Sequence, residues 1–164
     1  MTAEVAERVT VAAPAAEVFA AVADVRRMAR WSPECFAVWV WRRRNGLPDR
    51  FVGWNRRGPF VWFTTCRVAV AAPGEEFAFD VTTFGQPVAR WGYRFAQGPD
   101  GAAGGAERAG ATEVTEYWQD RRNRAATILG RVFTGTPRGG RPEANRQGMR
   151  ETLARLKREL EGHG

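Results

Sequence analysis

The chain has 164 residues, of which 44% are hydrophobic and 12% aromatic, and this composition supplies enough apolar surface for a single globular domain over residues 1–164. No apolar run approaches the ~18 residues of a membrane-spanning helix, so no membrane span is expected. Glu4, Glu7 and Arg8 stand where a signal peptide would be apolar, which predicts a cytoplasmic protein.

The net charge of +7 comes almost entirely from arginine, because Lys157 is the only lysine among 25 basic residues. The 18 acidic residues are interleaved with the arginines, which favours a solvated surface over a nucleic-acid footprint. No zinc-finger, helix-turn-helix or RNP-like motif accompanies the charge. The sequence therefore predicts no nucleic-acid partner.

Few side chains are suited to nucleophilic or metal chemistry. Cys35 and Cys66 are too few and too far apart for a disulfide scaffold or a usual zinc site. The single histidine, His163, stands next to the C-terminal glycine, where it is poorly placed to activate Ser32, the single serine. We expect no metal, no cofactor and no catalytic triad.

The N-terminal third predicts one strand and two helices. Residues 4–11 alternate as a strand, and Pro14 then opens a helix that carries Val18, Phe19 and Val22 on one face. A second, short helix is expected over 25–30. It ends there because Ser32 precedes a proline and is restricted to extended geometry.

The middle of the chain has a β-type pattern with Gly or Pro at each break. Short breaks imply antiparallel neighbours, and the segment 45–49 is expected to be the first of these loops. A stretch of Gly, Ala and small polar residues at 98–111 predicts a flexible loop. The strands are expected at 36–43, 50–56, 60–71, 75–83, 88–96 and 112–121.

The C-terminal part contains the clearest helix, at 142–161. Met149, Leu153, Leu156 and Leu160 form one apolar stripe along it, and Gly162 stops it. A partly helical segment at 124–133 and a break at 134–142 precede it. The order strand, two helices, six strands, long helix predicts an α+β domain with one antiparallel sheet against the terminal helix.

Several segments carry a resemblance that spans nearly the whole chain. Through them the sequence resembles the START/Bet v 1-like (SRPBCC) superfamily with its helix-grip fold. Within that superfamily it looks most like the bacterial polyketide cyclase/dehydratase and lipid-transport-like proteins. The segments are 13–19, 31–35, 51–58, 90–93, 112–116 and 145–149.

This resemblance implies a curved seven-stranded antiparallel sheet wrapped around the C-terminal helix, with two short helices after strand one and a cavity between sheet and helix. Members of the superfamily bind lipids, sterols, polyketides or other hydrophobic small molecules in that cavity. A minority catalyse cyclisation or dehydration there, and the superfamily shares no single catalytic residue set.

Alternation along each strand predicts which side chains face the cavity, because successive side chains point to opposite faces of a sheet. Placing Arg56, Arg67, Asp80, Arg90 and Arg94 in solvent turns the intervening residues inward. The inward set is Phe51, Gly53, Asn55, Trp62, Thr64, Cys66, Val68, Phe77, Phe79, Val81, Trp91, Tyr93 and Phe95.

The last strand carries the sharpest local signal. If Val114 and Trp118 face inward, Glu116 and Asp120 face inward with them, and a buried carboxylate has to be paired, protonated or hydrated. In the alternative interpretation the strand lies at an edge of the sheet, or it has the opposite parity, with Tyr117 inside and Glu116 in surface ion pairs. The sequence leaves both open.

The inward residues support two functions. The first is binding of a hydrophobic or aromatic, lipid- or polyketide-like small molecule. The second is a polyketide cyclase/aromatase or dehydratase that works without metal, with Glu116 as acid or base and Tyr93 and Glu34 assisting. A third interpretation is a protein whose interior is filled by side chains and whose role is interaction or structure. The candidate ligand contacts are Trp31, Asn55, Trp62, Thr64, Phe79, Trp91, Trp118 and Met149.

The expected partner is thus a hydrophobic small molecule. The positive charge alone suggests an acidic carrier protein as a second partner. The sequence leaves open whether the chain is a monomer or a homodimer.

Overall fold

The computed structural model describes residues 4–98, 110–124, 128 and 141–162. The elements are β1 (Glu4–Val11), α1 (Ala15–Ala23), the 3-10 helix η1 (Val25–Arg27), α2 (Met28–Trp31), β2 (Cys35–Arg44), β3 (Leu47–Arg57), β4 (Phe60–Ala72), β5 (Glu76–Thr83), β6 (Gln86–Gln97), β7 (Thr112–Asp120) and α4 (Arg141–Glu161).

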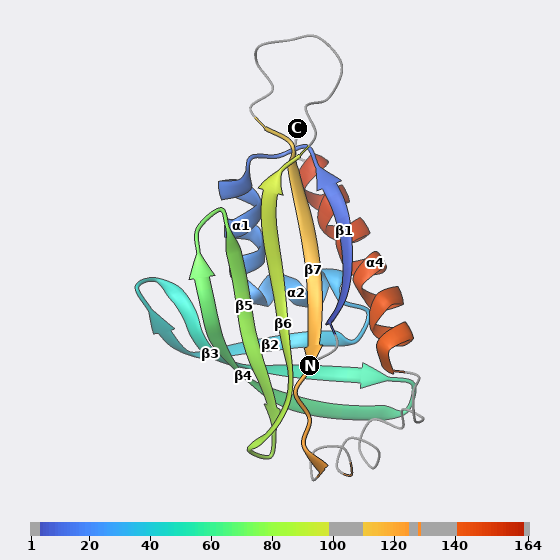
Figure 1. Cartoon of the computed structure of the whole chain (residues 1–164). Coiled ribbons are helices and arrows are strands. Elements are labelled where there is room, and N and C mark those ends of the chain that lie inside the picture. Colours follow the sequence, from blue (N-terminus) through green and yellow to red (C-terminus); the bar gives the residue numbers. More distant parts are fainter. Residues whose placement is uncertain (1–3, 99–109, 125–127, 129–140, 163–164) are drawn as a thin grey trace.

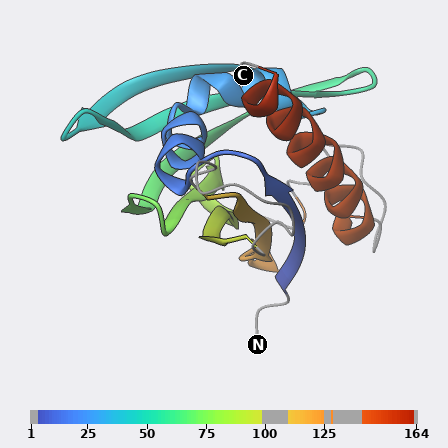
Figure 2. The same cartoon turned by 90° about the horizontal axis from the view of Figure 1, so that it is seen from above.

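The seven strands form one antiparallel sheet in the order β1-β7-β6-β5-β4-β3-β2. Strands β2 to β7 are a continuous meander, and β1 closes the sheet against β7 (Figure 1). Figure 2 shows the sheet curving around α1, α2 and α4, which lie on its concave side. The expected α+β helix-grip fold is confirmed.

The core lies between this concave inner face and the helices. Helix α4 turns its apolar stripe inward, so Met149, Leu153 and Leu156 are buried, and it packs chiefly on β1. Helix α1 inserts Phe19 edge-on against Phe77 at 6.2 Å between ring centroids. Burial of such side chains is the main favourable contribution to the fold.

The expected strands are all present, but one expected loop is wrong. The segment 45–49 is a two-residue turn at Asn45 and Gly46, whose φ angles are +50° and +80°, and residues 47–49 already belong to β3. Two positive φ angles match the twist of a tight hairpin, which Asn-Gly adopts at low cost. Pro48 is tolerated here because it stands next to the turn, at the start of the strand.

Three further expectations concern segments in which the structure describes few residues. The flexible loop predicted at 98–111, the helical segment at 124–133 and the break at 134–142 fall largely outside the described residues. None of the described helices combines the length and apolar character that crossing a bilayer requires.

Candidate functional site

The register of β6 and β7 brings Glu116 and Tyr93 together on the inner face. Their Cα atoms are direct cross-strand partners, and each residue is 3% exposed. The Tyr93 hydroxyl donates a hydrogen bond of 3.1 Å to Oε1 of Glu116. The inward interpretation of Glu116 is therefore the one the structure adopts, and its candidate partner Tyr93 is in contact with it.

Burial determines the protonation of this pair. Loss of hydration raises the pKa of Glu116 to about 8, against the opposing effect of the Tyr93 hydrogen bond. Burial and the neighbouring carboxyl raise the pKa of Tyr93 well above its ordinary value. Oε2 of Glu116 is buried and has no hydrogen-bond partner among the described residues. Near neutral pH the pair is thus a carboxylic acid and a phenol, both uncharged.

A charged group on the edge strand β1 is the neighbour of Glu116 across the sheet. Glu7 on β1 is the cross-strand partner of Glu116, and its carboxylate pairs with Arg150 at 3.1 Å and with Arg146 at 3.7 Å, both on α4. Asn145, which directly precedes Arg146 on α4, is 4% exposed, and its Nδ2 has no partner among the described residues. The helix thus contributes a buried amide donor that sequence reasoning missed.

A second polar group lies on the inner face of β3 and β4. Asn55 Nδ2 donates to the Gly53 carbonyl at 3.3 Å and to Thr64 Oγ1 at 3.5 Å, and Thr64 Oγ1 lies 3.9 Å from the Cys66 sulfur. Burial raises the pKa of Cys66 to about 12 and that of Cys35 to about 11. Both cysteines are therefore thiols and not nucleophilic thiolates near neutral pH.

The two polar groups belong to one buried region. Cys66 and Tyr93 both belong to one cluster of buried core residues, together with Phe51 on the inner face of the sheet. Among the described residues no group of three His, Cys, Asp or Glu side chains is arranged to hold a metal ion.

The predicted aromatic contacts are placed along the same face. Trp91 and Trp118 are cross-strand partners two positions from the Tyr93–Glu116 pair, and Trp118 packs with Met149 of α4. Phe79 is the partner of Trp91 on β5, and Trp62 is the partner of Asn55 on β4.

Two predicted residues lie at the end of the sheet where β2 begins. Trp31 is buried, and its indole N–H donates to Oε2 of Glu159 on α4 at 2.5 Å. Glu34 forms an ion pair of 3.9 Å with Arg57 at the end of β3. Trp31 thus helps to fix α4, and the proposed assistance of Glu34 stays a prediction.

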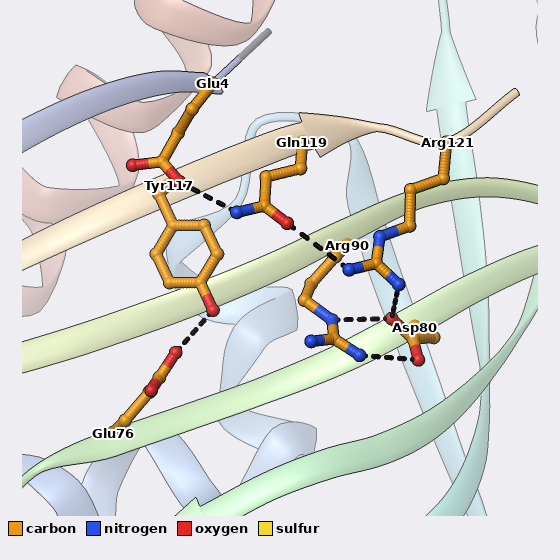
Figure 3. Close-up of polar contacts among 7 residues, drawn as sticks. All are labelled: Glu4, Glu76, Asp80, Arg90, Tyr117, Gln119 and Arg121. Atoms are coloured by element: carbon orange, nitrogen blue, oxygen red, sulfur yellow. Dashed lines mark hydrogen bonds and ion pairs between the residues drawn. The ribbon is translucent and has the colours of Figure 1, made fainter. Parts of the chain in front are cut away.

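The outer face of β5 to β7 carries a separate polar network (Figure 3). Tyr117 lies there over Gly92, where an added Cβ would be 2.3 Å from the ring, and its hydroxyl donates to Glu76 at 2.5 Å. Asp80 accepts a bidentate contact from Arg90 at 2.7 and 2.9 Å. The alternative parity with Tyr117 inside is excluded, although this side chain is also buried.

Both the sequence and the fold are similar to those of known proteins. The family described as polyketide cyclase / dehydrase and lipid transport matches residues 2–161, nearly the whole chain. The chain belongs to this family. No curated protein sequence matches this family member.

Solved structures support the fold of this family member. A START superfamily protein from Mycobacterium smegmatis matches with a TM-score of 0.70 at 16% identity, covering 98% of this chain and 99% of the other. The Zhui aromatase/cyclase from Streptomyces sp. R1128 matches with a TM-score of 0.68 at 18% identity, covering 100% and 99%. The di-domain ARO/CYC BexL matches with a TM-score of 0.66 at 21% identity, covering 98% of this chain and 50% of that one.

Proposed function

We propose that the chain binds a hydrophobic or aromatic small molecule that carries a carbonyl or hydroxyl oxygen, held between the inner face of the sheet and α4. The observation that carries the proposal is Oε2 of Glu116, a buried carboxyl oxygen without a partner among the described residues. A buried polar group of this kind costs about 1–3 kcal/mol when it stays unpaired, so a ligand that satisfies it gains that free energy.

The protonation of the site selects the chemistry of the ligand. With its pKa raised to about 8, Glu116 is mostly protonated at neutral pH, and its O–H donates to an acceptor atom. Nδ2 of Asn145 is a second buried donor. Two donors favour a ligand with neutral acceptor oxygens, and Trp91 and Trp118 supply apolar contacts along the same face.

A matched ligand pair tests the proposal. 1-Acetylnaphthalene and 1-ethylnaphthalene have similar size, but only the first has a carbonyl acceptor. We expect wild type to bind the ketone about tenfold more tightly in calorimetry or equilibrium dialysis, which corresponds to one buried hydrogen bond. Glu116→Met keeps the side-chain length and removes the donor, so it should bind both compounds equally. Equal binding to wild type, or no binding of either, would refute the proposal.

A specific observation supports an enzyme as the second candidate. A carboxyl group with a pKa of about 8 holds a proton that it can transfer near neutral pH, as general acid–base chemistry requires. In a dehydration, Oε2 of Glu116 would protonate the departing hydroxyl as its C–O bond breaks, and the resulting carboxylate would take the proton from the neighbouring carbon as the double bond forms. In a ring closure, Oε2 would protonate the carbonyl oxygen under attack, and the carboxylate would take the proton of the attacking carbon. Tyr93 would hold Oε1 in place.

Substrate turnover distinguishes the enzyme from the binding protein. With a poly-β-ketoacyl thioester as probe, Glu116→Gln should retain binding and lose turnover, and the rate should fall as the pH rises above about 8. Full turnover by this variant would refute the catalytic assignment. If an acidic carrier protein presents the thioester, as the net charge suggests, added salt should weaken the complex.

A further inference from the structure

A second surface, on the other side of the sheet, is unusually apolar for an exposed face. It is formed by the outer side chains of β2, β3 and β4 together with the β5–β6 turn. Trp39 is 63% exposed, Phe84 57% and Val61 52%. We call this surface the outer aromatic patch, which consists of Trp39, Trp41, Trp54, Val61, Phe63 and Phe84.

The patch is continuous across the strands. The Trp54 and Phe63 rings are 5.5 Å apart, and Phe63 lies 5.5 Å from Phe84 in an edge-to-face contact. Trp39 is the cross-strand partner of Val52, two residues before Trp54 on the same face. Large connected apolar areas of this kind mark interaction sites on proteins.

Almost all of the net charge of the protein lies in the same three strands. Residues 35–72 contain seven arginines and one acidic residue, Asp49, which leaves 18 basic and 17 acidic residues elsewhere. The interleaving of charges expected from the whole sequence therefore does not hold in this segment. On β5 to β7 and β1, by contrast, Asp80, Glu76 and Glu4 partner the outer-face side chains (Figure 3).

The chemistry of the patch restricts its partner. A second copy of the chain would bring two sets of seven arginines together, which disfavours self-association through this face. Stacking of nucleic-acid bases needs free ring faces, whereas the Trp54, Phe63 and Phe84 rings pack tilted or edge-on against one another, and Val61 has no ring. Exposed Trp and Phe mixed with arginine suit the boundary between headgroups and acyl chains of an anionic bilayer.

We propose that the outer aromatic patch docks this protein on the surface of a bilayer that contains anionic lipid. The aromatic side chains enter the headgroup region, and the surrounding arginines, among them Arg43 and Arg56, contact lipid phosphates. Docking leaves the inner face and α4 turned away from the membrane plane. It does not depend on what Glu116 binds.

Vesicle flotation tests the proposal. Wild type should float with vesicles of phosphatidylcholine and phosphatidylglycerol, and at least about fivefold less with phosphatidylcholine alone or in high salt. In the variant Trp39→Ser/Phe84→Asn, flotation should fall at least about tenfold because two apolar contacts are lost. Folding should be preserved, since Trp39 is exposed and asparagine suits the φ of +48° at position 84.

Two charge-reversal variants distinguish vesicle binding through the patch from binding through net charge alone. Arg43→Glu/Arg56→Glu removes positive charge from the patch, and Arg26→Glu/Arg158→Glu makes the same change on η1 and α4. Only the first should abolish flotation. Flotation that is absent in wild type, or reduced equally by both variants, would overturn the proposal. Dimerisation that buries Trp39, or binding of single-stranded DNA in preference to vesicles, would overturn it too.

Discussion

Replacing Glu116 with glutamine separates the shape of this buried side chain from its charge. Glutamine has nearly the same size, and its amide oxygen still accepts the hydrogen bond from Tyr93. The pKa of Glu116 is about 8 in the folded chain, compared with an ordinary value of 4.5. The folded state therefore holds this proton more tightly than the unfolded state.

The sign of the pH dependence follows from that difference. Between pH 4.5 and about 8 the unfolded chain has lost the proton and the folded chain has kept it, so the stability of wild type falls as the pH rises through this window. Each rise of one pH unit within this window lowers the free energy of unfolding by about 1.4 kcal/mol. Above about pH 8 both states are ionised and the loss is complete.

The expected result is a difference that grows with pH. Between pH 6 and pH 9 the stability of wild type should fall by about 3 kcal/mol relative to Glu116→Gln. Urea unfolding at several pH values, followed by far-UV circular dichroism, measures this difference. Glu113→Gln is the matched control, because Glu113 lies on the same strand with its carboxylate near Arg8 on the outer face.

The comparison also has a clear refuting outcome. If wild type and Glu116→Gln keep a constant difference from pH 6 to pH 9, the carboxyl group is ionised throughout and is not desolvated. The proposed donor role of Glu116 would then fail with it.

Three further substitutions test the packing. Gly92→Ala should destabilise the fold by about 2–4 kcal/mol, because the new Cβ would lie 2.3 Å from the Tyr117 ring. In a protein that already carries Tyr117→Ala, the same substitution should have little effect on stability. Glu159→Gln should lower the free energy of unfolding by about 1–2 kcal/mol at pH 7, because it weakens the hydrogen bond from Trp31. Burial raises the pKa of Glu159, but its hydrogen bonds outweigh that effect and keep the pKa below the ordinary value. The difference between wild type and the variant should therefore disappear in acid, where Glu159 is protonated. Leu156→Ala should cost about 2–5 kcal/mol by opening a cavity under α4. Urea unfolding measures all three, and a cost below about 0.5 kcal/mol for any of them would contradict the packing described.

Strand alternation was sufficient to predict most of the inner face. The outward arginines on β4 and β6 fix the parity of their strands, so Thr64, Cys66 and Tyr93 could be placed without a structure. The same rule placed Glu116 only as one of two alternatives. A charged and an aromatic residue stand side by side at 116 and 117, and either could be the buried one.

The parts that could not be predicted depend on contacts between distant segments. Tyr117 is buried on the outer face because Gly92, on the neighbouring strand, leaves room for its ring. Asn145 stands four residues before Met149, in line with the apolar stripe of α4, but its polar side chain gave no reason to expect burial. Neither the register of β6 against β7 nor the approach of a helix is encoded in local periodicity.

The order of the elements has a consequence for synthesis of the protein. The meander from β2 to β7 joins sequence neighbours, so it can assemble as the chain leaves the ribosome. Helix α4 comes last and packs chiefly on β1, the first strand. Helix α4 also contacts β7, so its docking contributes to the burial that raises the pKa of Glu116. The raised pKa of Glu116 therefore depends in part on the last element to be synthesised, and we expect a nascent chain that stops before α4 to lack it.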